Sequence, residues 1–351
     1  MVTSSTQYDI CIIGGGPTGL SAAIMASQRG YSVCIFEPKE AVIDKACGEG
    51  LMPTAIKTLE EMKVFPEYSH PFIGIRYFDG ENFVDGEFKQ GAGQGIRRIA
   101  LHQALLDRLQ ELPVARIHQR VTKLIEHQNH IEVEDISAQF VLVADGINSS
   151  IRKKLGLELP PKRRKRMGVR RHFQIKPWSD YVEVYWGEHA ECYVTPVAED
   201  QIGIAVTYYQ DHAPKGGNKF EQFMEQFPAL QAKIKDIPYS SHSRGAGPFE
   251  QRLSSPQKGR IMLIGDASGY LDPITGEGIR LGFGAAEKAL DLIQSGKWTQ
   301  YHKEHWKLIR KYWILTDSLL RLRQISFLRK LMVPFLQFFP KLFGRIVSDL
   351  G

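Results

Sequence analysis

Short apolar runs alternate with glycine turns and helical patterns along the first part of the chain. Residues 8–13 form an apolar run rich in Ile, and residues 31–36 form a second one. Continuous apolar runs of this length are typical of parallel strands that are buried on both faces. The residues between them, 18–28, are predicted to form a helix that ends at Gly30. The pattern predicts a strand, a helix and a second strand.

The turn after the first apolar run contains three glycines with separate tasks. Gly14 would permit the turn, Gly16 would let the backbone approach a pyrophosphate, and Gly19 would let the helix pack against the strand. Pro17 and Thr18 lie where the helix begins, so its first N–H groups and positive dipole end would point at the phosphates. This turn is typical of a dinucleotide site.

Glu37 directly follows the second apolar run. A carboxylate at this spacing accepts hydrogen bonds from a ribose 2′-hydroxyl and repels a 2′-phosphate. The bound dinucleotide is therefore expected to be FAD or NAD rather than NADP.

Further along the chain the pattern becomes first alternating and then helical. Apolar and polar residues alternate between residues 167 and 207, as they do in an antiparallel sheet. Residues 73–88 are predicted to form a hairpin and residues 218–237 a helix. The helical pattern resumes at residue 276 and continues to the end of the chain, with breaks near Gly296, Pro334 and Pro340.

These elements predict a domain that is interrupted by another one. The dinucleotide domain is expected to comprise residues 1–70, 95–160 and 255–300, the substrate domain residues 71–94 and 161–254, and a helical segment residues 301–351.

The composition is ordinary for a soluble globular protein. The chain has 351 residues, of which 43% are hydrophobic and 24% charged, enough for two domains. Its four cysteines lack CxxC spacing and its 11 histidines lack ligand spacing, so we expect a reduced compartment and no metal site. No leader pattern and no apolar run of about 20 residues is seen, which favours a cytoplasmic location.

The net charge of +6 comes partly from two basic regions. Residues 162–166 are interpreted as a solvated linker rather than a nucleic-acid site, because no interleaved aromatic residues accompany them. From residue 307 onward, cations alternate with bulky apolar residues. These helices are expected to pack on the protein, and the alternative is peripheral contact with the inner face of a membrane.

Three later motifs favour FAD over NAD. Arg98 stands at a predicted helix start, where it would contact the ribityl chain and the phosphates, and Asp145-Gly146 forms a turn after a strand. Asp266, in Gly265-Asp266, ends another strand and can bind a ribitol hydroxyl. The loop that follows would place a positive helix end beside the flavin N1 and C2 carbonyl; its candidate residues are Pro273, Gly276, Glu277, Gly278 and Ile279.

Together with the Cys47-Gly48-Glu49-Gly50 loop, these motifs resemble the geranylgeranyl reductase-like FAD-dependent oxidoreductases, within the p-hydroxybenzoate hydroxylase-type fold. The resemblance implies an α/β fold: a Rossmann-type, glutathione-reductase-like domain with noncovalent FAD, an inserted antiparallel-sheet substrate domain and C-terminal helices. It also places Gly48 at the cofactor and Cys47 close to the isoalloxazine. No second glycine fingerprint is present, so NAD(P)H would be a transient reductant.

The resemblance leaves the reaction open. We expect NAD(P)H-driven monooxygenation of a hydrophobic or aromatic small molecule, with reduction of carbon-carbon double bonds in a lipophilic substrate as the alternative. A prenyl reductase Tyr-x-Trp-x-Phe-Pro stretch appears only as Tyr193-Val194-Thr195-Pro196. Halogenation ranks lower because the Trp-x-Trp-x-Ile-Pro motif is missing, and a non-catalytic FAD-containing binding protein is the competing class.

Strand alternation indicates which polar residues would face the substrate. Arg170, His172 and Gln174 share one face of a predicted strand, and Glu191, Tyr193 and Thr195 share a face of another. The candidate catalytic residues are Cys47, Glu49, His172 and Tyr193.

Overall fold

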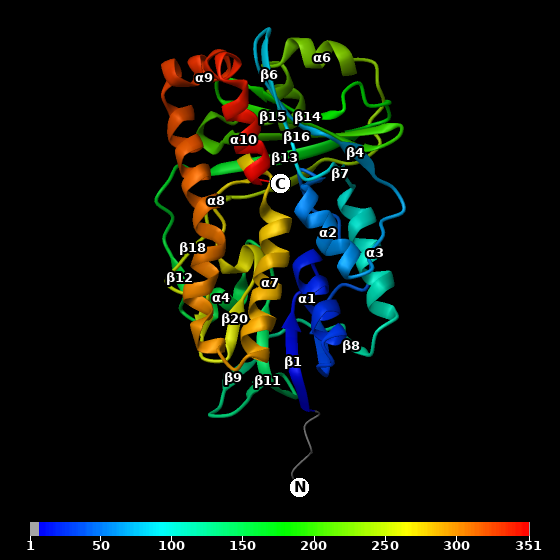
Figure 1. The fold of residues 1–351 in the computed structure, drawn as a ribbon, viewed down its shortest axis with the longest axis vertical. Helices are drawn as coiled ribbons and strands as arrows, with labels where there is room; N and C mark the ends of the chain where they lie inside the picture. Colours follow the sequence, from blue (N-terminus) through cyan, green and yellow to red (C-terminus); the bar gives the residue numbers. More distant parts are fainter. Residues whose placement is uncertain (1–6, 351) are drawn as a thin grey trace.

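The computed structural model describes residues 7–350 and contains two large sheets, one above the other in Figure 1, with the long helix α8 (Tyr301–Gln324) running along both. The strand order of the first sheet is β19-β20-β11-β1-β2-β8, and β9 and β10 extend it. Its strands are β1 (Gln7–Ile13), β2 (Val33–Phe36), β8 (Val114–Ile117), β9 (Leu124–Glu126), β10 (Ile131–Val133), β11 (Ile136–Val143), β19 (Gln257–Lys258) and β20 (Ile261–Leu263).

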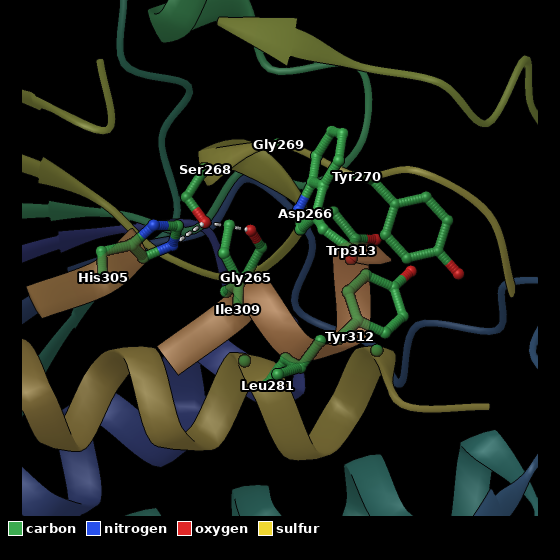
Figure 2. A pocket seen from close by; sticks show the side chains of 12 residues that line it. Gly265, Asp266, Ser268, Gly269, Tyr270, Leu281, His305, Ile309, Tyr312 and Trp313 are labelled. Atoms are coloured by element: carbon green, nitrogen blue, oxygen red, sulfur yellow. Dashed lines mark hydrogen bonds between the residues drawn. The ribbon is translucent and has the colours of Figure 1, made fainter. Parts of the chain in front are cut away.

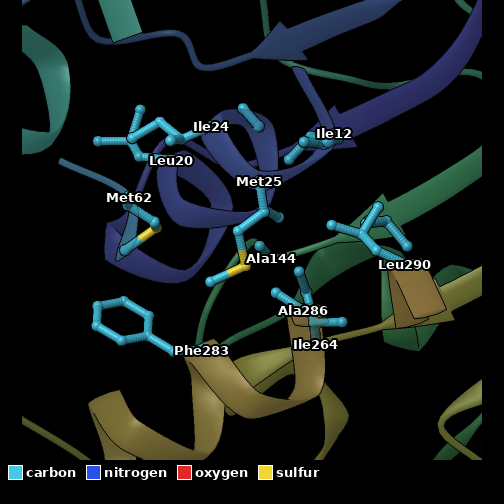
Figure 3. Packing of buried hydrophobic residues seen from close by; sticks show 14 of the residues in the cluster. Ile12, Leu20, Ile24, Met25, Met62, Ala144, Ile264, Phe283, Ala286 and Leu290 are labelled. Atoms are coloured by element: carbon cyan, nitrogen blue, oxygen red, sulfur yellow. The ribbon is translucent and has the colours of Figure 1, made fainter. Parts of the chain in front are cut away.

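The predicted strand, helix and strand at the start of the chain are confirmed. β1 pairs in parallel with both β2 and β11, and β11 pairs in parallel with β20. Three helices pack together over this sheet: α1 (Pro17–Gln28), α3 (Arg98–Gln110) and α7 (Gly278–Gln294). Figure 3 shows the resulting apolar core, in which Ile12 of β1 and Ile24 of α1 are fully buried together with Ala286 of α7.

The second sheet is mixed, whereas the sequence predicted an antiparallel one. Its order is β17-β13-β16-β15-β14-β5-β6, and the β14 to β5 pairing is parallel. The difference arises because the β5-β6 hairpin enters the sheet from a distant part of the chain, which alternation alone cannot orient. The strands are β5 (Gly74–Asp79), β6 (Asn82–Glu87), β13 (Arg166–Phe173), β14 (Tyr181–Trp186), β15 (Ala190–Ala198), β16 (Gln201–Tyr209) and β17 (Arg244–Ala246).

Two short helices cover the outer face of the second sheet. The predicted helix over residues 218–237 is divided into α5 (Lys219–Met224) and α6 (Pro228–Ile234), because Phe227, ahead of Pro228, leaves the helical conformation with φ −124° and ψ 63°. The remaining elements are α2 (Pro53–Glu61), α4 (Ser150–Lys154), β3 (Gly50–Leu51), β4 (His70–Phe72), β7 (Gly93–Gly95), β12 (Glu158–Leu159) and β18 (Arg252–Leu253).

The C-terminal helices α8, α9 (Ser326–Phe338) and α10 (Pro340–Leu350) pack on the inner face of the second sheet. The expected break near Pro334 is wrong, since Pro334 lies inside α9 and the chain breaks at Ile325 instead. The buried neighbours Met332, Val333 and Leu336 hold α9 against the sheet through the proline. Over the described residues, no helix combines the length and the apolar character needed to cross a bilayer.

The basic run at residues 162–166 is not simply a solvated linker. Arg163 pairs with Glu250 and Asp317, and Arg164 pairs with Asp211. Arg166 is 4% exposed and binds two buried carboxylates. The run of five basic residues could not reveal these partners, because the acidic side chains come from distant segments of the chain.

Replacement of Phe343 by Ala tests the docking of α10. Phe343 is buried against Tyr77, with ring centroids 4.7 Å apart, whereas Phe338 is 83% exposed. We expect Phe343→Ala to lower the free energy of unfolding by about 3–5 kcal/mol, and Phe338→Ala to change it by less than about 0.5 kcal/mol. Chemical denaturation measures both, and equal effects of the two substitutions would contradict this packing.

Candidate functional site

The glycine turn leaves room for a phosphate at one position only. A Cβ atom on Gly14 (φ +110°) would collide with the carbonyl oxygen of Ala144, and one on Gly19 with that of Gly14. At Gly16 the nearest atom to such a Cβ is Nη2 of Arg98, at 3.7 Å. The N-terminus of α1 has no side-chain cap, so its N–H groups are available to an anion.

Arg98 brings an unpaired cation to this turn. The residue is 8% exposed, and among the described residues its guanidinium has no hydrogen bond or ion pair. Burial lowers the pKa of Arg98, while the nearby Cys47 and Asp266 act in the opposite direction. Because a buried cation without a counter-ion is costly, a bound pyrophosphate would stabilise this arrangement.

Glu37 is held where an adenosine ribose would lie. Its Oε2 accepts a hydrogen bond from the Gly15 N–H at 2.8 Å, and its Oε1 accepts one from the Lys39 N–H at 3.1 Å. A recess beside it is lined by Gly15, His102 and Arg116, among others. Each oxygen retains a lone pair for a ribose hydroxyl.

Asp266 lies at the carboxyl end of β20, where the sequence predicted a ribitol contact. No hydrogen bond to its carboxylate occurs among the described residues. Burial raises the pKa of Asp266, and the cations Arg98 and Lys45 oppose that shift. Figure 2 shows Asp266 in a recess next to the aromatic rings of Tyr270, Tyr312 and Trp313.

The loop before α7 presents a second uncapped helix start. Gly276 has φ +72°, a conformation that favours glycine, and Gly278 begins α7 without a side-chain cap. Glu277 is buried and pairs with Arg280, and burial raises the pKa of Glu277. Pro273 begins the short turn that positions this loop, and Ile279 packs against the core.

Asp145 and Gly146 shape a turn in the described structure. Oδ2 of Asp145 accepts hydrogen bonds from the N–H groups of Ser150 and Ile151, at 2.8 and 3.2 Å. Gly146 has φ +85°. Their contact with a cofactor stays a prediction.

Two of the candidate catalytic residues bind each other. His172 Nε2 lies 2.6 Å from Oε2 of Glu49, and both side chains are buried. The other oxygen, Oε1, accepts a hydrogen bond from the Arg98 N–H at 2.9 Å. Glu49 also has φ +62°, a strained conformation for a non-glycine residue. Glu49 and His172 therefore connect the loop at residues 47–50 to α3 and to the second sheet, and their catalytic role stays a prediction.

Cys47 and Tyr193 occupy different surroundings. Burial, reinforced by Glu49, raises the pKa of the Cys47 thiol, so it stays protonated at neutral pH. Tyr193 lies on the inner face of the second sheet, and among the described residues its buried hydroxyl has no hydrogen-bond partner. The structure thus brings Cys47, Glu49 and His172 together, whereas Tyr193 lies apart from them, near Arg166 and Asp272.

Sequence reasoning missed a network of buried ion pairs. Arg166 binds Asp272 at 2.7 Å and Glu191 at 2.8 Å, and Arg323 of α8 also pairs with Glu191. Arg170 likewise pairs with Asp44 at 2.5 Å. The sequence analysis had placed Arg170 on one face of a predicted strand, but it gave no indication of the acidic partners of these arginines. Within the described part of the chain, no cluster of three His, Cys, Asp or Glu side chains could hold a metal.

These observations fit FAD. Arg98, whose guanidinium is unpaired among the described residues, lies beside Gly16, where the phosphates are expected, and Glu37 is fixed where the ribose is expected. The helices α1 and α7 both begin without a side-chain cap. When bound, FAD would supply the redox chemistry at the end of the site near the α7 loop.

Replacement of Arg98 by Met tests the pyrophosphate contact. We expect the dissociation constant of FAD to rise at least about 10-fold, since charge-assisted hydrogen bonds contribute roughly 1.5–3 kcal/mol. Arg108→Met is the matched control, because Arg108 lies on the same helix and pairs with Glu111. FAD titration of the apoprotein measures both constants. Unchanged affinity in Arg98→Met would refute the assignment.

Comparisons with known proteins agree with this site. A family model described as an FAD binding domain matches residues 103–290, and one described as an FAD dependent oxidoreductase matches residues 9–47. A digeranylgeranylglycerophospholipid reductase of Methanothrix thermoacetophila is 25% identical over 83% of this chain and 79% of its own. A putative 2-heptyl-3-hydroxy-4(1H)-quinolone synthase of Rhodococcus erythropolis is 26% identical over 76% and 74%.

A solved structure of the flavin-dependent brominase Bmp2 has a TM-score of 0.80 at 19% identity, covering 97% of this chain and 94% of that one. It shows a likeness of fold alone. The first family model covers more than half of the chain, and the resemblance to geranylgeranyl reductase-like flavoproteins is confirmed. The chain belongs to the FAD binding domain family and is an FAD-dependent oxidoreductase.

Proposed function

We propose that this protein reduces a carbon-carbon double bond in a lipophilic substrate. The observation that carries the proposal is the position of the Cys47 thiol, which lies within electrostatic reach of the Arg98 guanidinium and accepts a hydrogen bond from the Glu49 N–H. Reduction of a double bond needs a hydride and a proton. When bound, reduced FAD would supply the hydride, and the Cys47 thiol would supply the proton.

The residues around Cys47 would hold this proton donor in place. The Cys47 sulfur accepts a hydrogen bond from the Glu49 N–H at 3.4 Å, and the Thr195 hydroxyl donates to the Gly48 carbonyl at 2.8 Å. The thiol gives its proton to one carbon as the hydride reaches the other. The resulting thiolate regains a proton from solvent, so the residue ends unchanged.

Apolar side chains supply the surroundings for a lipophilic substrate. Met52 and Ile274, from the loops at the first sheet, share one buried cluster with Tyr77 and Tyr193 of the second sheet. The relative from Methanothrix is named as a reductase of a digeranylgeranyl lipid, which supports this choice of substrate class.

Monooxygenation, which the sequence favoured, is the second candidate. It is supported by the relative named as synthase of a hydroxylated quinolone. In either case the electrons would come from NAD(P)H that binds transiently, because the described fold has one glycine fingerprint at the start of an α/β unit.

Anaerobic single turnover distinguishes the two reactions. We expect protein reduced by dithionite under argon to add hydrogen to geranylgeraniol, detected by mass spectrometry. Cys47→Ala should slow this step by about 100-fold. Cys192→Ala is the control and should leave the rate unchanged, because Cys192 is buried on the outer face of the second sheet. Product that forms only in air, with stoichiometric oxygen uptake, would favour monooxygenation instead.

We also propose that α9 touches a membrane surface, from which a lipophilic substrate would arrive. Phe327, Leu331, Phe335 and Phe338 are 44–83% exposed along this helix. Exposed cations Lys330 and Lys341 lie near them and suit anionic headgroups.

Co-sedimentation with vesicles of anionic phospholipid tests this contact. Phe327→Ser with Phe338→Ser should at least halve the bound fraction, because each removes apolar area that would enter the interface. Phe65→Ser, which removes a residue 71% exposed elsewhere, is the control. If the unmodified protein, the double variant and the Phe65→Ser control all bind the vesicles to the same extent, the proposal is refuted.

A further inference from the structure

Buried hydrogen-bond donors without acceptors gather around Glu191, on the inner face of the second sheet. We call this set the donor cluster: Arg166 Nη1, Arg323 Nη2, Trp186 Nε1 and Tyr193 Oη. Arg166, Arg323 and Trp186 are each 4% exposed. Polar atoms that are buried this deeply almost always have partners.

Glu191 and its neighbours bring these donors together from four elements. Both guanidiniums pair with Glu191 and lie over the ring of Tyr209, at 4.9 Å for Arg166 and 5.1 Å for Arg323. Trp186 stands opposite Glu191 in the β14 to β15 register. Tyr193 is two residues further along β15, on the same face.

Three of the four carboxylate oxygens beside the cluster already accept hydrogen bonds, and the fourth, Oε1 of Glu191, pairs with Nε of Arg323. Oε2 of Glu191 accepts hydrogen bonds from Arg166 at 2.8 Å and from Thr207 at 2.7 Å. Asp272 accepts from Arg166 at 2.7 Å and from the Ile274 N–H at 3.1 Å. Among the described residues, the cluster therefore has more donors than acceptors, and each buried donor left without a partner destabilises the folded protein.

The charge around the cluster decides what kind of ligand fits. Burial and the nearby Arg166, Arg329 and Arg164 all lower the pKa of Arg323. This position disfavours a further cation or amine, because such a group would add positive charge and donors. A group with acceptor oxygens and no donors of its own would satisfy the cluster.

We propose that the donor cluster binds an acceptor oxygen of the substrate, carried as a ketone or carboxylate on an otherwise apolar molecule. The ligand's role as substrate rests on the proposed function, whereas binding itself does not. Arg166 also holds Asp272, which precedes the turn to α7. An oxygen bound here would fix the apolar body of the ligand relative to the loop before α7.

Three probes of similar size test the subsite by calorimetry on the oxidised holoprotein. They are 2-ethylnaphthalene, which has no acceptor, 2-acetylnaphthalene, which has a neutral carbonyl, and 2-naphthoate, which has a carboxylate. We expect at least one oxygen-bearing probe to bind 10-fold or more tightly than the ethyl probe. A preference for 2-acetylnaphthalene or for 2-naphthoate identifies which oxygen is recognised.

Tyr193→Phe and Trp186→Phe each remove one donor and should reduce that preference at least 3-fold. Tyr208→Phe is the matched control, since Tyr208 is buried on the opposite face of the same sheet. Equal binding of all three probes, or a preference unchanged in both variants, would overturn the proposal and leave water as the partner of these donors. Because no turnover is needed, failure of the reductase assay would not alter this result.

Discussion

The carboxylate of Glu49 is the contact on which the arrangement of the site depends. One of its oxygens accepts from the first N–H of α3, and the other binds His172 in the second sheet. The side chain of the same Arg98 residue lies beside Gly16. A single buried carboxylate thus connects the glycine turn, the loop at residues 47–50 and the second sheet. The positive φ of Glu49 indicates that the surrounding contacts hold this loop in a strained conformation.

A second set of charges performs a similar task at the other end of the site. Arg166 joins the loop before α7 to the second sheet through Asp272 and Glu191, and Arg323 adds α8 to the same network. Charges buried in this way contribute little net stability, but removal of one partner leaves another charge unpaired. Such networks fix relative positions, which suits a site built between two sheets.

The apolar surroundings explain why few side chains are free to do acid or base chemistry. Glu49 and His172 are bound to each other, Glu277 is bound to Arg280, and burial raises the pKa of the Tyr193 hydroxyl. The cofactor carries the redox chemistry, so the protein mainly has to bind, orient and exclude water. A protonated thiol at Cys47 is consistent with that division of roles.

The sequence by itself determined the dinucleotide fold, FAD as the cofactor and most elements, because the glycine turn and the strands and helices around it lie in local patterns that fix backbone geometry. Only the tertiary structure decided that β5 pairs in parallel with β14, that α9 continues through Pro334, and that Glu49 binds His172. These features depend on contacts between residues far apart in the chain. Local periodicity carries no information about such partners.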